Sequence, residues 1–258
     1  MGYLIAVGVA GLVWLAFFVF RKDVRSKMLW CGAYCAVVLS VGFLILRILF
    51  LHVPVSEMIV PGYWDPDTLF DIARITGGWS IEDTFYMFFT GGIAAVLYDV
   101  VRNKKVLPVT GSLFRRRKMA TRIPAVGVFA MALLLPVNFI WELIAFCAIG
   151  AIVIWYARPD LLTRSLVGGA SYAFLYYTVF SFLLFFSPTY VTTHYNIPNL
   201  SGVFLGPLPL EEILFAFVFG LMWASLYEYA KDIRPGSRSP CGARVLHTQP
   251  IPGPVAPR

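Results

Sequence analysis

Residues 81–99 read IEDTFYMFFTGGIAAVLYD, and residues 210–228 read LEEILFAFVFGLMWASLYE. The two stretches align at a constant offset of 129 positions, because 211 − 82 and 228 − 99 both equal 129, half of the 258 residues. Each stretch begins with an acidic doublet, Glu82-Asp83 or Glu211-Glu212, and continues as an apolar, aromatic run. Ionisable groups are costly at membrane depth, so a duplicated segment that keeps carboxylates there points to chemistry.

The composition is that of an integral membrane protein. Hydrophobic residues make up 59% of the chain and charged residues 14%, and the mean hydropathy is +0.75. Uncharged apolar runs about as long as a bilayer core is thick recur along the chain. The net charge of +7 does not indicate a nucleic-acid partner, because the basic residues fall in short loops between apolar runs, where they set the membrane orientation.

Five runs are clear membrane spans, and one stretch is ambiguous. Residues 123–156 are too long for one span and short for two. Pro136, Asn138 and Glu142 in the middle of this stretch suit a tight turn better than a membrane centre. The five clear spans are Tyr3–Phe20, Leu29–Val53, Glu82–Val101, Leu161–Phe186 and Glu211–Ala230.

The distribution of basic residues decides the number of helices. Basic segments follow the first and third spans, precede the penultimate span and follow the last, whereas the loops 54–80 and 187–209 are acidic or neutral. If residues 123–156 form two short helices, every basic segment lies in the cytoplasm. The sequence therefore predicts an all-α protein with seven transmembrane helices in the plasma membrane, with its N-terminus outside and its C-terminus in the cytoplasm.

This topology predicts two parallel three-helix repeats joined by a linker helix. We expect a first repeat at residues 1–101, a basic cytoplasmic loop and linker helix at 102–139, and a second repeat at 140–232. Residues 233–258 are rich in Pro, Gly and Ser, which predicts a disordered tail. The inner loops also match, because residues 21–23 (RKD) resemble residues 158–160 (RPD) at an offset of 137. Parallel repeats predict a pseudo-two-fold axis along the membrane normal.

Each acidic doublet has a structural interpretation and a functional one. Acidic residues in a first turn complement the helix dipole, and Ser80 with Asp83 fits a capping box. One doublet alone favours capping, but two doublets in register, each before an aromatic span, favour function. Neighbouring helix positions point about 100° apart, so one acid of each doublet can face the helix bundle while the other faces the loop.

A buried carboxyl beside aromatic rings is suited to protonating an alkene. Burial favours its neutral, proton-donating form, and aromatic faces stabilise the cation that results. The candidate acid–base residues are Glu82, Asp83, Glu211 and Glu212, and the candidate substrate-contacting rings are Phe85, Tyr86, Phe89, Phe215 and Phe219.

Two further charged residues are candidates for a supporting role. Glu142 falls in the turn expected within 123–156. Arg47 lies near the outer end of the second span, and the second half has no basic counterpart. Arg47 can pair with one of the acids, or it can reach the lipid headgroups, and both interpretations stay open.

Several chemistries find no support in the sequence. A Gly-x-Gly-x-x-Gly fingerprint and a Cys-x-x-Cys pair are both absent, and three scattered histidines are too few for a multi-histidine iron site. The last span contains no lysine for a retinal Schiff base. Asp67 and Asp71 form an Asp-x-x-x-Asp spacing like that of diphosphate-binding enzymes, but a second acidic motif is missing. We therefore expect no cofactor and no metal.

Residues 209–215, PLEEILF, resemble the Pro-x-Glu-Glu-x-x-Phe signature of integral-membrane, non-flavin lycopene cyclases. Residues 80–86, SIEDTFY, resemble a first copy in which Ser80 replaces proline and Asp83 replaces glutamate. Members of this family occur as two small bacterial subunits, as one fused archaeal chain and as a domain of bifunctional fungal proteins. The resemblance covers most of residues 1–232.

The resemblance implies an enzyme that converts the linear end groups of carotenoids into rings without net redox chemistry and without a flavin. It implies lycopene or a related linear carotenoid as substrate, with the lipid bilayer and carotenoid-pathway enzymes as partners. Carried over by position, the acid–base residues would be Glu82, Asp83, Glu211 and Glu212. Asp83 is one methylene shorter than its counterpart, which predicts that the two repeats are unequal, with one catalytic and the other structural.

Two other functional classes compete with the cyclase. One is another isoprenoid-transforming membrane enzyme, and the other is a seven-helix carrier of an isoprenoid or carotenoid. Parallel repeats and midplane sites suit carriers. The acids here lie at helix ends instead, with few polar residues deeper in the spans to line a path. Formation of a ring from lycopene distinguishes the cyclase from a carrier.

Overall fold

The structure is a computed structural model that describes residues 2–49, 59–104 and 138–231, with residues 122, 126 and 233 singly. Most of the predicted basic loop, the linker helix before Asn138 and the predicted disordered tail lie outside these residues. Within the described part, six helices are long and apolar enough to cross a membrane, which confirms an all-α membrane fold. These helices are α1 (Gly2–Phe20), α2 (Arg25–Leu49), α5 (Ile81–Val101), α7 (Phe139–Ala157), α8 (Leu162–Phe186) and α10 (Leu210–Lys231).

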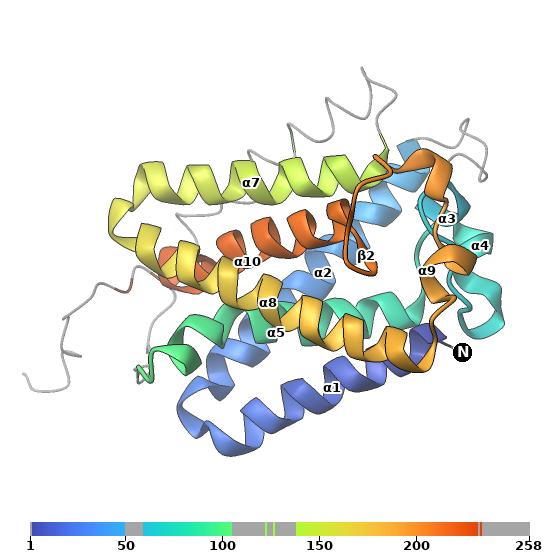
Figure 1. Cartoon of the computed structure of the whole chain (residues 1–258). Helices are drawn as coiled ribbons and strands as arrows, with labels where there is room; N and C mark the ends of the chain where they lie inside the picture. The colour runs from blue at the N-terminus through green and yellow to red at the C-terminus, as the bar shows by residue number, and fades with distance from the viewer. Residues whose placement is uncertain are drawn as a thin grey trace, which may run out of the picture.

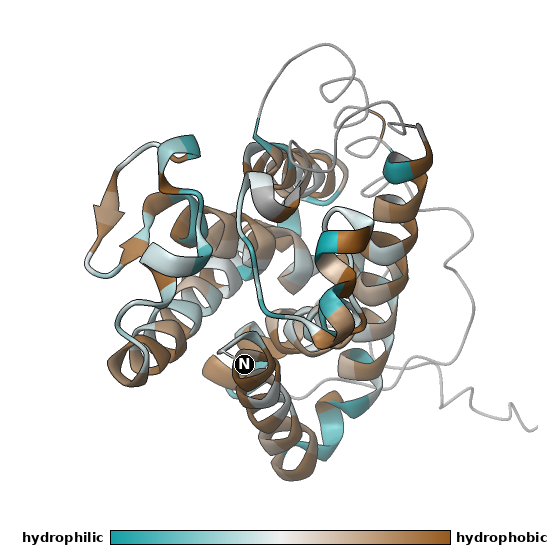
Figure 2. Ribbon diagram, turned by 90° about the vertical axis from the view of Figure 1, so that its right-hand side faces the viewer, coloured by the Kyte–Doolittle hydropathy of each residue, from teal (hydrophilic) through white to brown (hydrophobic). Residues whose placement is uncertain are grey.

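Short elements form the connections. At one end of the bundle, the loop before α5 holds α3 (Ile59–Gly62), η3 (Leu69–Asp71) and α4 (Ile72–Thr76). The loop before α10 holds α9 (Tyr190–His194), η6 (Ile197–Asn199) and the antiparallel pair β1 (Phe204–Leu205) and β2 (Leu208–Pro209). At the opposite end, the 3₁₀ turns η1 (Lys22–Val24) and η5 (Pro159–Leu161) join α1 to α2 and α7 to α8. Figure 2 shows hydrophobic residues along the helices and hydrophilic residues gathered mainly in loops and helix ends.

Local sequence signals explain where the helices begin. Ser80 caps α5 in a full capping box with Asp83, as the sequence predicts. Asn138 caps α7, because its side chain accepts a hydrogen bond from Ile140 N. Within the stretch 123–156, α7 therefore begins after Asn138, and the first of the two helices expected there lies almost entirely outside the described residues. Glu142 was expected in the turn itself, but it lies in the first turn of α7.

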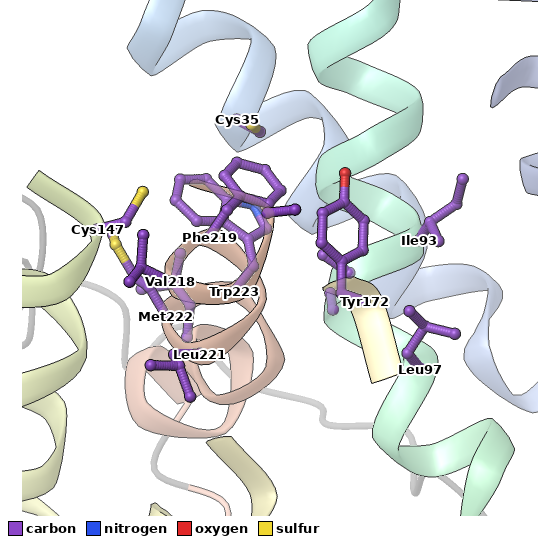
Figure 3. Packing of buried hydrophobic residues seen from close by; sticks show 14 of the residues in the cluster. Cys35, Ile93, Leu97, Cys147, Tyr172, Val218, Phe219, Leu221, Met222 and Trp223 are labelled. Atoms are coloured by element: carbon purple, nitrogen blue, oxygen red, sulfur yellow. The ribbon is translucent and has the colours of Figure 1, made fainter. Parts of the chain in front are cut away.

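The centre of the bundle is α10, which packs against α5, α7 and α8 (Figure 1). The close approach of α10 to α8, and of α5 to α2, depends on glycines. A Cβ at Gly220 would lie 2.8 Å from Gly169 Cα, and one at Gly91 would lie 2.5 Å from Cys35 Cβ. The rings of Phe219 and Trp223 stack with centroids 4.7 Å apart in this core (Figure 3). Aromatic and small residues together therefore fill the central contact.

Four charged side chains, three of them buried and that of Arg164 partly buried, tie the bundle together at the end away from the acidic doublets. Lys27 Nζ donates to Asp99 at 2.9 Å and to Glu228 at 2.7 Å. Arg164 donates to Asp99 at 2.7 Å and lies 3.0 Å from Glu228. Two positive and two negative groups thus connect α2, α5, α8 and α10. This explains why α2 begins at Arg25, before the predicted Leu29: its first turn carries Lys27, which is fully buried.

Replacing Lys27 with methionine is expected to destabilise the protein strongly. The substitution keeps most of the apolar stem but leaves two buried carboxylates to share Arg164, and breaking a buried pair in this way costs about 3–5 kcal/mol. Thermal unfolding of the detergent-solubilised protein, followed by tryptophan fluorescence, measures the change. The exposed Lys22→Met is the matched control, and adding Glu228→Gln to Lys27→Met should restore part of the loss. Equal midpoints for the two single variants would contradict the role of the four charges.

Candidate functional site

Both acidic doublets lie in the first turns of α5 and α10, at the end of the bundle that carries α3, α4 and α9 (Figure 1). In each helix the two acids take different directions, because successive residues are about 100° apart. Three of the four, Glu82, Glu211 and Glu212, are buried, and Asp83 is partly buried.

The first acid of each doublet binds the loop that precedes its helix. Glu82 accepts a hydrogen bond from Leu69 N at 2.6 Å, and Glu211 accepts one from Ser201 N, also at 2.6 Å. In both residues the second carboxylate oxygen is buried without a partner in the described structure. Neither Glu82 nor Glu211 lines the cavity described next. The first acids therefore fasten the loops to the helices.

The second acid of each doublet lines a single cavity of about 420 Å³. Asp83 reaches it from α5, together with Tyr86 and Thr90, which follow at helical spacing. Glu212 reaches it from α10, together with Phe215. The cavity wall is largely apolar and draws on all six long helices and on both loops.

Hydroxyl groups surround both carboxylates in the cavity. Glu212 accepts hydrogen bonds from Tyr63, Tyr176 and Tyr195, the last at 3.2 Å. Asp83 accepts hydrogen bonds from Tyr3 and from the backbone N–H and hydroxyl of Ser80, the two from Ser80 at 2.7 Å. Each carboxylate is thus held in a fixed direction by three donors.

The two loops join each other above the cavity. Asp65 N donates to His194 O at 2.6 Å, and Asn196 N donates to Tyr63 O at 2.9 Å. Trp64 and Tyr195 form an isolated antiparallel bridge between the two loops. Through this contact, the loop before α5 delivers Tyr63 to a carboxylate on α10.

The two tyrosines on these loops are fixed as hydrogen-bond donors. Burial, and then the charge of Glu212, hold the pKa of Tyr63 well above the ordinary tyrosine value. The same two causes raise the pKa of Tyr195. Both phenols therefore stay protonated at physiological pH and donate to Glu212.

The aromatic residues expected at the site divide into two groups. Tyr86 and Phe215 line the cavity. Phe85 is 55% exposed, Phe89 packs against Trp14, and Phe219 belongs to the core. Sequence reasoning missed several aromatic lining residues because they lie in loops or on helices without an acidic motif: Tyr3, Tyr63, Trp64, Trp79, Tyr172, Tyr176, Phe180, Tyr190 and Tyr195. The high tyrosine content of the chain, 13 residues, was the sequence signal that could have indicated a tyrosine-rich site.

The two candidate supporting residues do not line the cavity. Arg47 lies in the last turn of α2, and Glu142 is buried in the first turn of α7. The hydrogen bonds described above for Asp83 and Glu212 come from tyrosine, serine and backbone donors. The pairing of Arg47 with an acid stays a prediction.

The arrangement is suited to moving protons on an apolar substrate. Within the described ranges, no cluster of three or more His, Cys, Asp and Glu side chains could hold a metal ion. The ionisable side chains on the cavity wall are two carboxyl groups and tyrosine phenols. A carboxyl group can donate or accept a proton, while the surrounding rings stabilise positive charge on the substrate.

Comparison with known proteins identifies one relationship. The family model described as lycopene cyclase matches the chain over residues 3–101 and 138–230. These two stretches contain all four acids of the doublets, Tyr63, Tyr176 and Tyr195. No curated protein and no solved structure matches the chain significantly.

Replacing Glu82 or Glu211 with alanine is expected to release the corresponding loop. A hydrogen bond to a charged group contributes about 1.5–3 kcal/mol, so exchange of the Leu69 or Ser201 amide should accelerate about ten- to hundredfold. Hydrogen–deuterium exchange with mass spectrometry of loop peptides measures this. Glutamine at either position keeps an acceptor oxygen, so the loop amide should exchange at nearly the original rate in the glutamine variants. Unchanged exchange in the alanine variants would show that these carboxylates do not hold the loops.

Proposed function

Because the chain belongs to the lycopene cyclase family, we propose that it converts linear carotenoid end groups into rings by a proton-initiated, redox-neutral cyclisation. Family membership supports a carotenoid cyclase function, a carotenoid substrate and a membrane location. The observation that carries the proposed mechanism is that Asp83 and Glu212 both line one largely apolar, aromatic cavity.

The proposed reaction adds one proton and removes one. A carboxylic acid protonates the terminal double bond of the end group and leaves a tertiary cation. The neighbouring double bond attacks this cation, which forms the new carbon–carbon bond and moves the positive charge into the ring. A carboxylate then removes a proton next to that charge, and its electron pair closes the ring double bond. The enzyme ends with the same number of protons, and no electrons are transferred.

The surroundings of the two acids support this chemistry. Proton transfer by a positioned side chain contributes about 10²–10⁴-fold to a rate, provided that the group lies within reach of the reacting atom. The hydroxyl donors around Asp83 and Glu212 fix the directions of the carboxyl groups. Tyrosine and tryptophan rings on the cavity wall can stabilise the cation before ring closure. The largely apolar wall keeps water from capturing the cation.

The duplicated architecture forms part of the proposal. Lys27 and Arg164 are 137 positions apart, and Asp99 and Glu228 are 129 apart, the same two offsets found in the sequence. Each basic residue contacts both acids. Swapping the two repeats therefore maps the ion pairs within a repeat, and those between repeats, onto one another. This supports two parallel repeats, at residues 1–101 and 140–232. The basic segments of the sequence, which lie at the ends of the spans away from the doublets, support placing the doublets at the outer membrane face.

A ring that carries one hydrogen from solvent tests the proposed function. Membranes that contain the protein and lycopene made in ordinary water are transferred to D₂O, and the carotenoids are separated by chromatography and analysed by mass spectrometry. We expect cyclic product with one deuterium per ring, because the acid exchanges its proton with solvent between turnovers. Membranes with Asp83→Asn and Glu212→Gln together provide the background. Unchanged lycopene would contradict the cyclase and favour a carrier, and rings without deuterium would contradict proton initiation from an exchanging acid.

A further inference from the structure

We propose that Asp83 and Glu212 form one composite catalytic site that cyclises a single end group in each binding event. In this arrangement neither repeat contains a complete site, and this replaces the expectation that one repeat is catalytic and the other structural. The half-cyclised carotenoid leaves the cavity before its second end enters. The inference rests on the proposed function and specifies how the two repeats share the reaction.

The first argument comes from the directions of the four acids. A reaction that adds and then removes a proton is served by a donor and an acceptor. Each repeat directs only one carboxyl group into the cavity, because Glu82 and Glu211 are fastened to backbone N–H groups of their own loops. An acid–base pair in this cavity therefore takes one member from α5 and the other from α10.

The second argument comes from the contacts of Glu212. Its tyrosine partners come from both halves of the chain: Tyr63 precedes α5, whereas Tyr176 lies on α8 and Tyr195 follows α9. The loop-to-loop contact that positions Tyr63 and Tyr195 crosses between the repeats as well. The carboxylate of the second repeat is therefore completed by a residue of the first.

The third argument comes from the size of the cavity. Its volume of about 420 Å³ lies in the lower part of the range of about 300–1,000 Å³ that is typical of pockets for drug-sized ligands. An extended carotenoid is longer and larger than such a ligand. The cavity can therefore hold one end group with part of the polyene, and the rest of the substrate extends beyond it.

A second hollow on the described part of the bundle offers no alternative site. It lies between α5 and α8, at the opposite end of α5 from the doublet, and its lining contains no ionisable side chain. The residues that line it are Leu97, Val101, Ala170, Ser171, Phe174 and Leu175.

Single substitutions and a time course test the composite site. Membranes with limiting enzyme and excess lycopene are sampled over time, with wild type, Asp83→Asn, Glu212→Gln and the control Asp71→Asn. The control makes the same chemical change in an exposed residue with a positive φ of 53°, which asparagine tolerates, outside the cavity. We expect Asp83→Asn and Glu212→Gln each to slow formation of the first ring at least a hundredfold, while Asp71→Asn keeps the wild-type rate.

The wild-type time course should show monocyclic carotenoid in molar excess over the enzyme before any bicyclic product appears. A mixture of the Asp83→Asn protein with the Glu212→Gln protein should not recover activity, because every chain still lacks one of the two carboxyl groups. Two independent sites would be revealed if either single variant kept about half of the wild-type rate, and this would overturn the proposal. Bicyclic product without free monocyclic carotenoid would also overturn it. Unchanged lycopene with the wild-type protein would instead reject the proposed function itself.

Discussion

Two hydrogen bonds, from Leu69 N to Glu82 and from Ser201 N to Glu211, orient the acidic ends of α5 and α10. With the first acid of each doublet turned toward its loop, the next residue lies about 100° further round the helix and faces the bundle. The same bonds hold the two loops, which join above the cavity and carry Tyr63 and Tyr195 to Glu212. Loop attachment and cavity lining are therefore divided between adjacent residues. Asp83 both completes the capping box with Ser80 and lines the cavity, so neither interpretation of a doublet excludes the other.

The opposite end of the bundle meets a different constraint. Lys27, Asp99 and Glu228 are buried and Arg164 is partly buried, so each charge depends largely on the others for compensation. These contacts fix four helices relative to one another. The end held by these four charges and the end where the two loops join together hold Asp83 and Glu212 around one cavity, although the two residues are 129 positions apart in the chain.

The sequence predicted the helices well because their signals are local. Apolar length located the long helices, and the capping box located the start of α5 at Ser80. The site was only half predictable, because the choice between Glu82 and Asp83 depends on a hydrogen bond from a loop residue 13 positions earlier. The tyrosines around Glu212 come from three segments that only folding brings together. Because Arg25 and Lys27 are charged, the sequence placed them in a loop. In the structure they belong to α2, where Lys27 is buried against Asp99 and Glu228.

The central claim is that one carboxyl group from each repeat acts on one end group. An experimental structure of the protein with a bound bicyclic carotenoid tests this most directly. The account predicts one ring of the ligand in the cavity, within contact distance of both Asp83 and Glu212, with the polyene extending out of the bundle. A structure with the ring beside only one of these residues, or with two rings held separately by the two repeats, would contradict it.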